Sequence, residues 1–219
     1  MIYKKIKDIS ALSRLTKLKH LDLLDNPVKN LKPLKFLINL EYLRLAETRI
    51  TDLSPLKNLI KLKKLDISSN NVSNLTPLAS LSSLEYLAIQ YNQVKGLAPL
   101  SHLKKLRNFK ANHNKIEDIS PLSELPNLQI LELHKNKIRD VSSLAVLQNL
   151  EEVNLRGNEI EDTSIFTQIK SINVFSARRN KQLMTCAPMN WTQLQEGKHC
   201  SKEEVKKHNE KSWWKKIFD

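Results

Sequence analysis

The sequence repeats itself every 22 residues. An asparagine recurs at this interval, and Thr48 replaces it once: the positions are Asn26, Asn70, Asn92, Asn114, Asn136, Asn158 and Asn180. Apolar residues, most of them large, recur five and three positions before each asparagine, and an aliphatic residue recurs two positions after it as far as Asn158. No insertion breaks this register between residues 6 and 180. A unit of this length cannot bury its own leucines, so consecutive units must stack into a solenoid.

Each unit predicts a short strand, a turn and a short helical segment. The pattern L-x-x-L-x-L alternates apolar and polar residues, as in a strand with one buried face. The asparagine amides can bond backbone groups and form a ladder, in which we expect Thr48 to be the weakest member. A polar residue suited to capping the helix then follows. In most units a proline comes next, which the first turn of a helix tolerates. These polar residues are Asp8, Asn30, Asp52, Asn74, Asp118, Asp140 and Asp162.

Composition argues against an enzyme. Only 3 of the 219 residues are glycine, which nearly excludes glycine-rich phosphate loops. His113 and His134 would lie on neighbouring strands, but a third ligand is missing, so we interpret them as surface histidines and expect no metal. The residues after Asn180 are too few for a separate ligase domain. We expect no catalytic site and no cofactor.

The motif resembles leucine-rich repeats, in particular the 22-residue class of bacterial internalins and of the eukaryotic phosphatase-1 regulatory subunit. It reads LEYLRLAETRITDLSPLKNLIK at residues 40–61 and LQILELHKNKIRDVSSLAVLQN at residues 128–149. The resemblance implies an α/β solenoid, a right-handed horseshoe with a concave parallel sheet of about eight strands and short 3₁₀ turns on the convex side. It also implies recognition of a protein partner by the concave sheet.

The repeat divides the chain into a solenoid, residues 1–180, and a C-terminal cap, residues 181–219. The first unit is incomplete, and no polar cap or signal peptide precedes it. Either the sequence is trimmed at its start, or Met1, Ile2 and Tyr3 form a minimal lid.

The C-terminal cap contains both cysteines, Cys186 and Cys200. It resembles the two-cysteine caps of secreted bacterial leucine-rich repeat proteins, which implies a disulfide; the alternative is two reduced thiols. A capping box that begins at Ser201 predicts a helix from 202 to about 211. We interpret Trp213 and Trp214 as a cover for the core rather than a membrane contact.

The repeat also predicts which side chains the concave face exposes. We group them in four columns whose members are 22 residues apart and begin at His20, Asp22, Leu24 and Asp25. Seven basic and six acidic residues occupy the columns, a balance of +1, whereas the chain carries +13. A nucleic-acid groove would concentrate basic residues on its binding face, so this class of partner is disfavoured.

Two groups on the face are candidates for partner contacts. One is an aromatic patch, Tyr42, Tyr86 and Tyr91 with Leu24 nearby, because exposed tyrosines on a rigid sheet are typical interface anchors. The other is a set of like charges at the C-terminal end of the face, Arg156, Arg178 and Arg179, which favours an acidic segment of the partner. Alternating charges such as Asp22, Arg44 and Asp66 should neutralise each other. The predicted partner-binding residues are Leu24, Tyr42, Arg44, Lys64, Tyr86, Gln90, Tyr91, Lys110, His134, Arg156, Arg178 and Arg179.

We therefore expect a non-catalytic, monomeric module that binds a protein partner at a bacterial surface, in the periplasm or in the secreted pool. An intracellular scaffold or enzyme regulator of the phosphatase-binding type is the alternative. A third class is an adhesin that contacts a membrane or glycan surface through Trp213 and Trp214 or the tyrosines.

Overall fold

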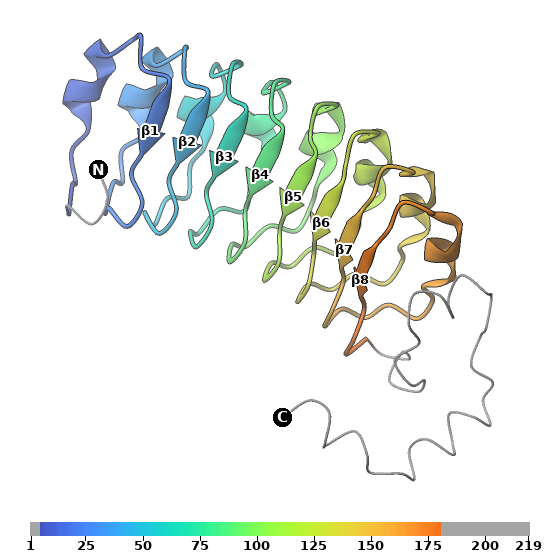
Figure 1. Cartoon of the computed structure of the whole chain (residues 1–219). Coiled ribbons are helices and arrows are strands. Elements are labelled where there is room, and N and C mark those ends of the chain that lie inside the picture. Colours follow the sequence, from blue (N-terminus) through green and yellow to red (C-terminus); the bar gives the residue numbers. More distant parts are fainter. Residues whose placement is uncertain (1–4, 181–219) are drawn as a thin grey trace, which may run out of the picture.

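The computed structural model describes residues 5–180. In this part the chain forms a single curved solenoid, with strands on one side and short helical turns on the other (Figure 1). No helix of these residues is long and apolar enough to cross a membrane. Several expectations lie outside the described residues: the lid of Met1, Ile2 and Tyr3, the cysteine pair, the helix from 202 to about 211, and the two terminal tryptophans.

One parallel sheet contains all eight strands of the described residues in chain order. Each strand pairs with the next at an offset of 22 residues, as in Leu21 with Leu43 and Leu43 with Leu65. The strands are β1 (His20–Asp22), β2 (Tyr42–Arg44), β3 (Lys64–Asp66), β4 (Tyr86–Ala88), β5 (Asn108–Lys110), β6 (Ile130–Glu132), β7 (Glu152–Asn154) and β8 (Val174–Ser176). The expected concave sheet is confirmed, and members of a column stand on neighbouring strands.

The convex side carries eight 3₁₀ helices within residues 5–180, one before each strand. The first N–H of a helix donates to the predicted polar residue, as Ser54 does to Asp52 Oδ1 at 2.8 Å. That polar residue lies one position before the formal N-cap, which itself makes no side-chain bond. The helices are η1 (Ser10–Arg14), η2 (Lys32–Phe36), η3 (Ser54–Leu56), η4 (Thr76–Leu78), η5 (Ala98–His102), η6 (Ser120–Glu124), η7 (Ser142–Val146) and η8 (Ser164–Gln168).

The core is a continuous column of aliphatic side chains between the sheet and the helices. Leu43 and Leu45 of one coil, for example, are fully buried, and so are their equivalents Leu65 and Ile67. Phe109 is the largest of these fully buried residues. Because each coil buries its leucines against both neighbours, the solenoid holds its outward side chains on a rigid base.

The asparagine ladder joins each coil to the one before it. Asn92 Nδ2 donates to the carbonyl oxygens of Ile89 in its own coil and Ile67 in the preceding coil, at 3.1 and 2.9 Å. Its Oδ1 accepts from the N–H of Val72 at 2.8 Å. The Thr48 hydroxyl has two acceptors, the Leu45 carbonyl oxygen of its own coil at 2.7 Å and Asn70 Oδ1 of the next coil at 3.2 Å, and neither belongs to the preceding coil. Within residues 5–180, Thr48 therefore makes the fewest links of the ladder positions.

The residue before each ladder position adopts a left-handed backbone conformation. Its φ lies between 52° at Asp25 and 68° at Gly157. This region is sterically unfavourable for residues other than glycine, yet seven of the eight residues are not glycine. These residues form the fourth column, so their side chains leave the sheet at the edge where the chain turns.

Outside the four columns, several lysines are exposed but paired. Lys19 and Lys63 both contact Glu41, at 3.2 and 2.8 Å. Lys104 contacts Glu124 at 2.9 Å. The pairs join residues of neighbouring coils, so part of the excess positive charge is compensated outside the concave face.

Candidate functional site

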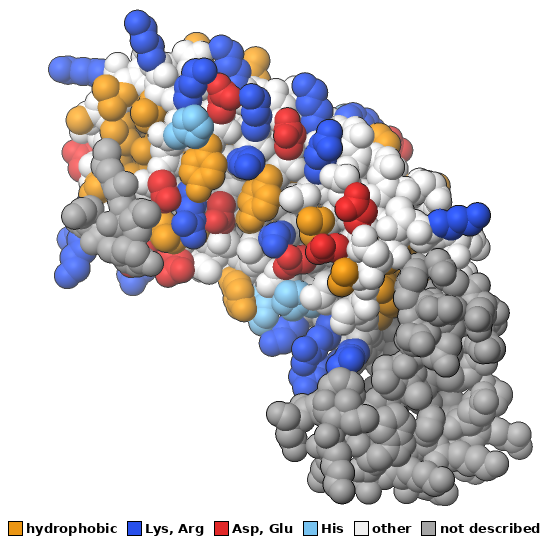
Figure 2. Space-filling view, viewed as in Figure 1, with side chains coloured by type: hydrophobic (Ala, Val, Ile, Leu, Met, Phe, Trp, Pro, Cys, Tyr) orange, Lys and Arg blue, Asp and Glu red, His pale blue; other side chains and the backbone are white. Residues whose placement is uncertain are grey.

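The concave face presents its side chains in the four columns, with mixed charges and several aromatic rings (Figure 2). Columns one and two begin on the strands, and columns three and four follow at the turn. Not every column position is accessible: Ala46 and Ala88 are buried, and Leu24 is only 8 % exposed. Leu24 therefore contributes little surface to the expected contact area.

Charges in column two neutralise each other, as the alternation predicted. Arg44 lies between Asp22 and Asp66, with nitrogen-to-oxygen distances of 3.8 and 3.2 Å. Lys110 Nζ lies 2.6 Å from Glu132 Oε1, and this bond raises the pKa of Lys110. Arg44 and Lys110, both predicted to bind a partner, are already engaged within the face.

Two tyrosines stand in column one. Tyr42 and Tyr86 are half-buried, and Lys64 stands between them on β3. The ring centroid of Tyr42 lies 6.3 Å from that of His20. Desolvation by burial raises the pKa of both tyrosines. Their hydroxyls therefore stay protonated at neutral pH and can donate to a partner.

The third tyrosine belongs to a separate group. Tyr91 is five residues beyond Tyr86, which is about 15 Å along an extended chain. Its ring stacks on His113 with centroids 4.1 Å apart and planes at 21°. His113 in turn meets His134 edge-on at 5.6 Å. The expected single aromatic patch is thus two groups, and the second includes histidines that the sequence interpretation treated as plain surface.

The surroundings of the two histidines lower the pKa of both imidazoles. Burial is the main cause, and the positive charge of Lys135 lowers the pKa further, while Glu132 raises that of His134. Within residues 5–180, no group of three or more His, Cys, Asp or Glu side chains could hold a metal ion.

Three polar atoms next to this aromatic group are buried without a hydrogen-bond partner. They are Gln90 Oε1, Asn112 Oδ1 and His134 Nδ1. All three belong to column three and lie on consecutive coils, 22 residues apart. Asn112 itself is only 6 % exposed. A buried polar atom without a partner is unfavourable in a folded protein, so three in one row mark an unusual stretch of the face.

A basic group follows at the C-terminal end of columns three and four. Lys135, Arg156, Arg178 and Arg179 are all exposed. In Figure 2, Lys and Arg side chains gather beside His side chains at this edge of the face. Among residues 5–180, the ion pairs of the concave face are those of Arg44 and Lys110, and Lys135 and Arg156 take part in none.

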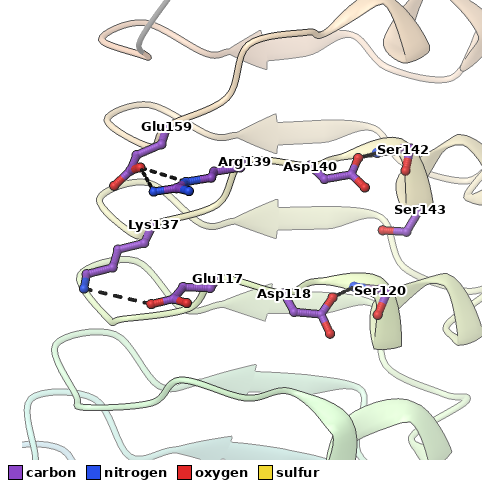
Figure 3. A pocket seen from close by; sticks show the side chains of 9 residues that line it. All are labelled: Glu117, Asp118, Ser120, Lys137, Arg139, Asp140, Ser142, Ser143 and Glu159. Atoms are coloured by element: carbon purple, nitrogen blue, oxygen red, sulfur yellow. Dashed lines mark hydrogen bonds and ion pairs between the residues drawn. The ribbon is translucent and has the colours of Figure 1, made fainter.

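A surface depression of about 440 Å³ lies away from the sheet, among the loops that lead to η6 and η7 (Figure 3). Its charged side chains form ion pairs with one another: Lys137 lies 4.0 Å from Glu117, and Arg139 lies 2.9 Å from Glu159. Asp118 accepts the N–H of Ser120, as a helix cap. Because these groups serve the loops themselves, the depression is a weaker candidate than the concave face.

Comparisons with known proteins agree with the geometry. A family described as "leucine-rich repeat region" matches residues 1–196. An internalin (inlF) of Listeria monocytogenes is 34% identical, with a TM-score of 0.80 over 81% of this chain and 53% of that chain. Internalin C2 of the same organism is 45% identical, with a TM-score of 0.69 over 69% of this chain and 67% of that chain.

A leucine-rich repeat protein of Leptospira interrogans shares the fold, with a TM-score of 0.78 at 24% identity over 87% of this chain and 49% of that chain. This chain thus spans about half the length of the internalin (inlF) and of the Leptospira protein. Among curated protein sequences, none matches the chain.

Proposed function

The chain belongs to the leucine-rich repeat family, whose members are typically protein-binding modules, and from this premise we propose that it is a non-catalytic module that recognises a partner protein through its concave sheet. Its internalin relatives favour a bacterial surface or secreted setting.

The observation that carries this proposal is the pair Tyr42 and Tyr86 on a rigid sheet. Both rings are half-buried, so they are fixed in place, and both still present area to a partner. Fixed aromatic side chains bind at a low entropic cost and are frequent energetic centres of interfaces. Lys64 between them and Gln90 beyond them complete the contact area that we propose for the middle of the face.

The C-terminal end supports an acidic region in the partner. Arg156 and Arg178 stand on neighbouring coils, and Arg179 follows directly. Opposite charges across an interface accelerate association and fix orientation, whereas like charges side by side repel. We place the acidic part of the partner over these arginines and its apolar part over the tyrosines.

Pull-down with the intact chain as bait, followed by quantitative mass spectrometry, tests the proposal. The double variant Tyr42→Ala/Tyr86→Ala should lose the specific partner, and Arg156→Glu/Arg178→Glu should weaken its binding. The matched control is Phe36→Ala/Ile38→Ala, which removes exposed apolar side chains from the convex side. Equal capture by all variants would refute recognition through the concave face.

The setting has its own test. We propose that Cys186 and Cys200 form a disulfide, as expected of an extracytoplasmic protein. Denatured native material should then show no reactive thiol until a reductant is added. Two reactive thiols would instead place the chain in a reducing compartment, as the scaffold alternative requires.

A further inference from the structure

The row of unpaired polar atoms in column three is the starting point. Asn112 Oδ1 and His134 Nδ1 are buried without a partner on neighbouring coils, and the Asn112 residue is 6 % exposed. Leaving such atoms unpaired destabilises the free protein, so their retention points to a bound state in which they are paired.

A proton on His134 Nδ1 would pair these two atoms, because Asn112 Oδ1 is an acceptor. The neutral imidazole has one N–H and can serve either Asn112 or a carboxylate at Nε2, whereas the imidazolium has an N–H at both ring nitrogens and can serve both at once. Equivalent side chains on neighbouring strands lie about 4.8 Å apart, so a small rotation can let Nδ1–H donate to Asn112 Oδ1. A ligand that stabilises the imidazolium would therefore also satisfy the buried amide.

The charges around this pair define the ligand. From the third coil onward, columns three and four contain Ser68, Ser69, Gln90, Tyr91, Asn112, His113, His134, Lys135, Arg156, Gly157, Arg178 and Arg179. None of these residues is acidic. Glu132 of column two also acts on His134, but it is paired with Lys110, whereas Lys135 and Arg156 have no ion-pair partner within residues 5–180. An incoming cation would be repelled here, whereas a carboxylate would find three positive or protonatable groups.

We propose that Asn112 and His134 anchor a carboxylate side chain of an acidic segment of the partner protein. His134 Nε2–H and the cations of Lys135 and Arg156 donate to the carboxylate, while His134 Nδ1–H donates to Asn112 Oδ1. Tyr91 and His113, stacked at 4.1 Å, form the wall against which the methylene groups of the acidic side chain pack. This inference rests on the proposed function and names the part of the face that reads the acidic segment.

Fluorescence anisotropy with a labelled glutamate-rich peptide and the full-length chain at low salt measures this binding. The same peptide with glutamine in place of glutamate is the ligand control. We expect the glutamate peptide to bind, and Asn112→Ala or His134→Ala to weaken it about tenfold, as expected for the loss of one charge-assisted contact. Asn108→Ala, the same residue type at the first position of β5, and His102→Ala on η5 are matched controls that should bind normally.

Thermal unfolding separates this role from a structural one. Because Asn112 Oδ1 is buried and unpaired, Asn112→Ala should melt at the same or a higher temperature than the parent chain. A lower melting temperature would mean that the amide serves folding, and the inference would then be wrong. Asparagine and histidine NMR side-chain signals should shift on addition of the peptide, with those of Asn112 and His134 shifting most.

Other outcomes also decide the matter. Equal binding of the glutamine peptide, or equal binding of a heparin fragment, would show general attraction to polar or polyanionic molecules and would overturn the proposal. If the glutamate peptide fails to bind while partner capture still depends on Tyr42 and Tyr86, only this inference falls. If the peptide binds but the tyrosine variant captures its partner normally, this inference stands and only the role of Tyr42 and Tyr86 as partner contacts is refuted.

Discussion

Asn70 Oδ1 accepts both the backbone N–H and the hydroxyl of Thr48, at 3.1 and 3.2 Å. Thr48 is thus hydrogen-bonded to the coil that follows it. Within residues 5–180, its side chain makes no hydrogen bond to the coil that precedes it. Each ladder asparagine from Asn70 to Asn180, by contrast, bonds at least two backbone groups of the preceding coil. The junction between the first two coils is therefore joined less tightly than the others.

Replacing Thr48 by asparagine should complete the ladder. By analogy with Asn70, which bonds the Ile50 N–H and the Leu45 carbonyl of the preceding coil, the new amide would reach the Val28 N–H and the Leu23 carbonyl. We expect Thr48→Asn to raise the free energy of unfolding by about 1 kcal/mol, and Thr48→Ala to lower it by a similar amount. Urea unfolding of the three proteins measures this, and an Asn variant no more stable than the parent would contradict it.

Gly96 occupies the position at which the other coils carry a capping Asp or Asn. Its backbone is not in the left-handed region, and a Cβ added there would have no atom within 4 Å. Gly96→Asn should stabilise the chain by about 1 to 2 kcal/mol, because it adds a cap for η5 and restricts the unfolded chain. Gly96→Ala restricts the unfolded chain without adding a cap, so thermal unfolding should rank it between the parent and the Asn variant.

Acid should lower the free energy of unfolding through protonation of Glu41. Hydrogen bonds from Lys63 and Lys19 lower its pKa from 4.5 to about 2. A carboxylate with a lowered folded pKa stabilises the fold above its unfolded value, and this contribution is lost as the pH falls from about 4.5 to about 2. Urea unfolding across this range should show a shallower acid dependence for Glu41→Gln at low salt. The difference should shrink at high salt, since the charges are exposed.

The histidines predict a second pH effect, near neutrality. Burial first, then Lys135 and Arg156, lower the pKa of His134, while Glu132 opposes them; burial, Lys135 and His134 lower that of His113. The unfolded chain therefore takes up protons first, and stability should decrease as the pH falls below about 6.5. His134→Gln should flatten this dependence in thermal unfolding.

Binding of the glutamate-rich peptide should show the opposite trend. A bound carboxylate favours the imidazolium of His134, so affinity should increase as the pH falls through the same range. Anisotropy titrations at about pH 7.5 and about pH 5.5 measure the change. An affinity independent of pH in this range would show that His134 is not protonated on binding.

The repeat made the backbone predictable. Because the interval of 22 residues never changes, the sequence alone placed Tyr42 beside His20, and Arg44 between Asp22 and Asp66, as the strand register confirms. The helix caps followed from the same reasoning, although the polar residue proved to be one position before the N-cap. These features depend on backbone spacing, which the repeat determines.

Side-chain packing on the face was not predictable in the same way. Their shared column in the sequence predicts that Tyr91 and His113 are neighbours. The stacking of their rings also depends on side-chain rotamers and on the left-handed backbone of column four, which the repeat does not predict. The burial of Asn112 depends on the bulk of adjacent side chains rather than on its own position. The distance between Tyr86 and Tyr91 along the chain was the signal that could have separated the two aromatic groups.

The unbroken register also spaces the side chains of the concave face at regular intervals. Tyr42 stands on the second strand-bearing coil and His113 on the fifth, and neighbouring coils are about 4.8 Å apart. Deletion of residues 64–85 would therefore bring the two side chains closer by one coil while leaving the contacts between the remaining coils alike. The shortened protein should still fold, but a partner that contacts both residues would no longer match their spacing. Evolution can tune such a surface by duplicating or losing entire units, which changes its span in discrete increments.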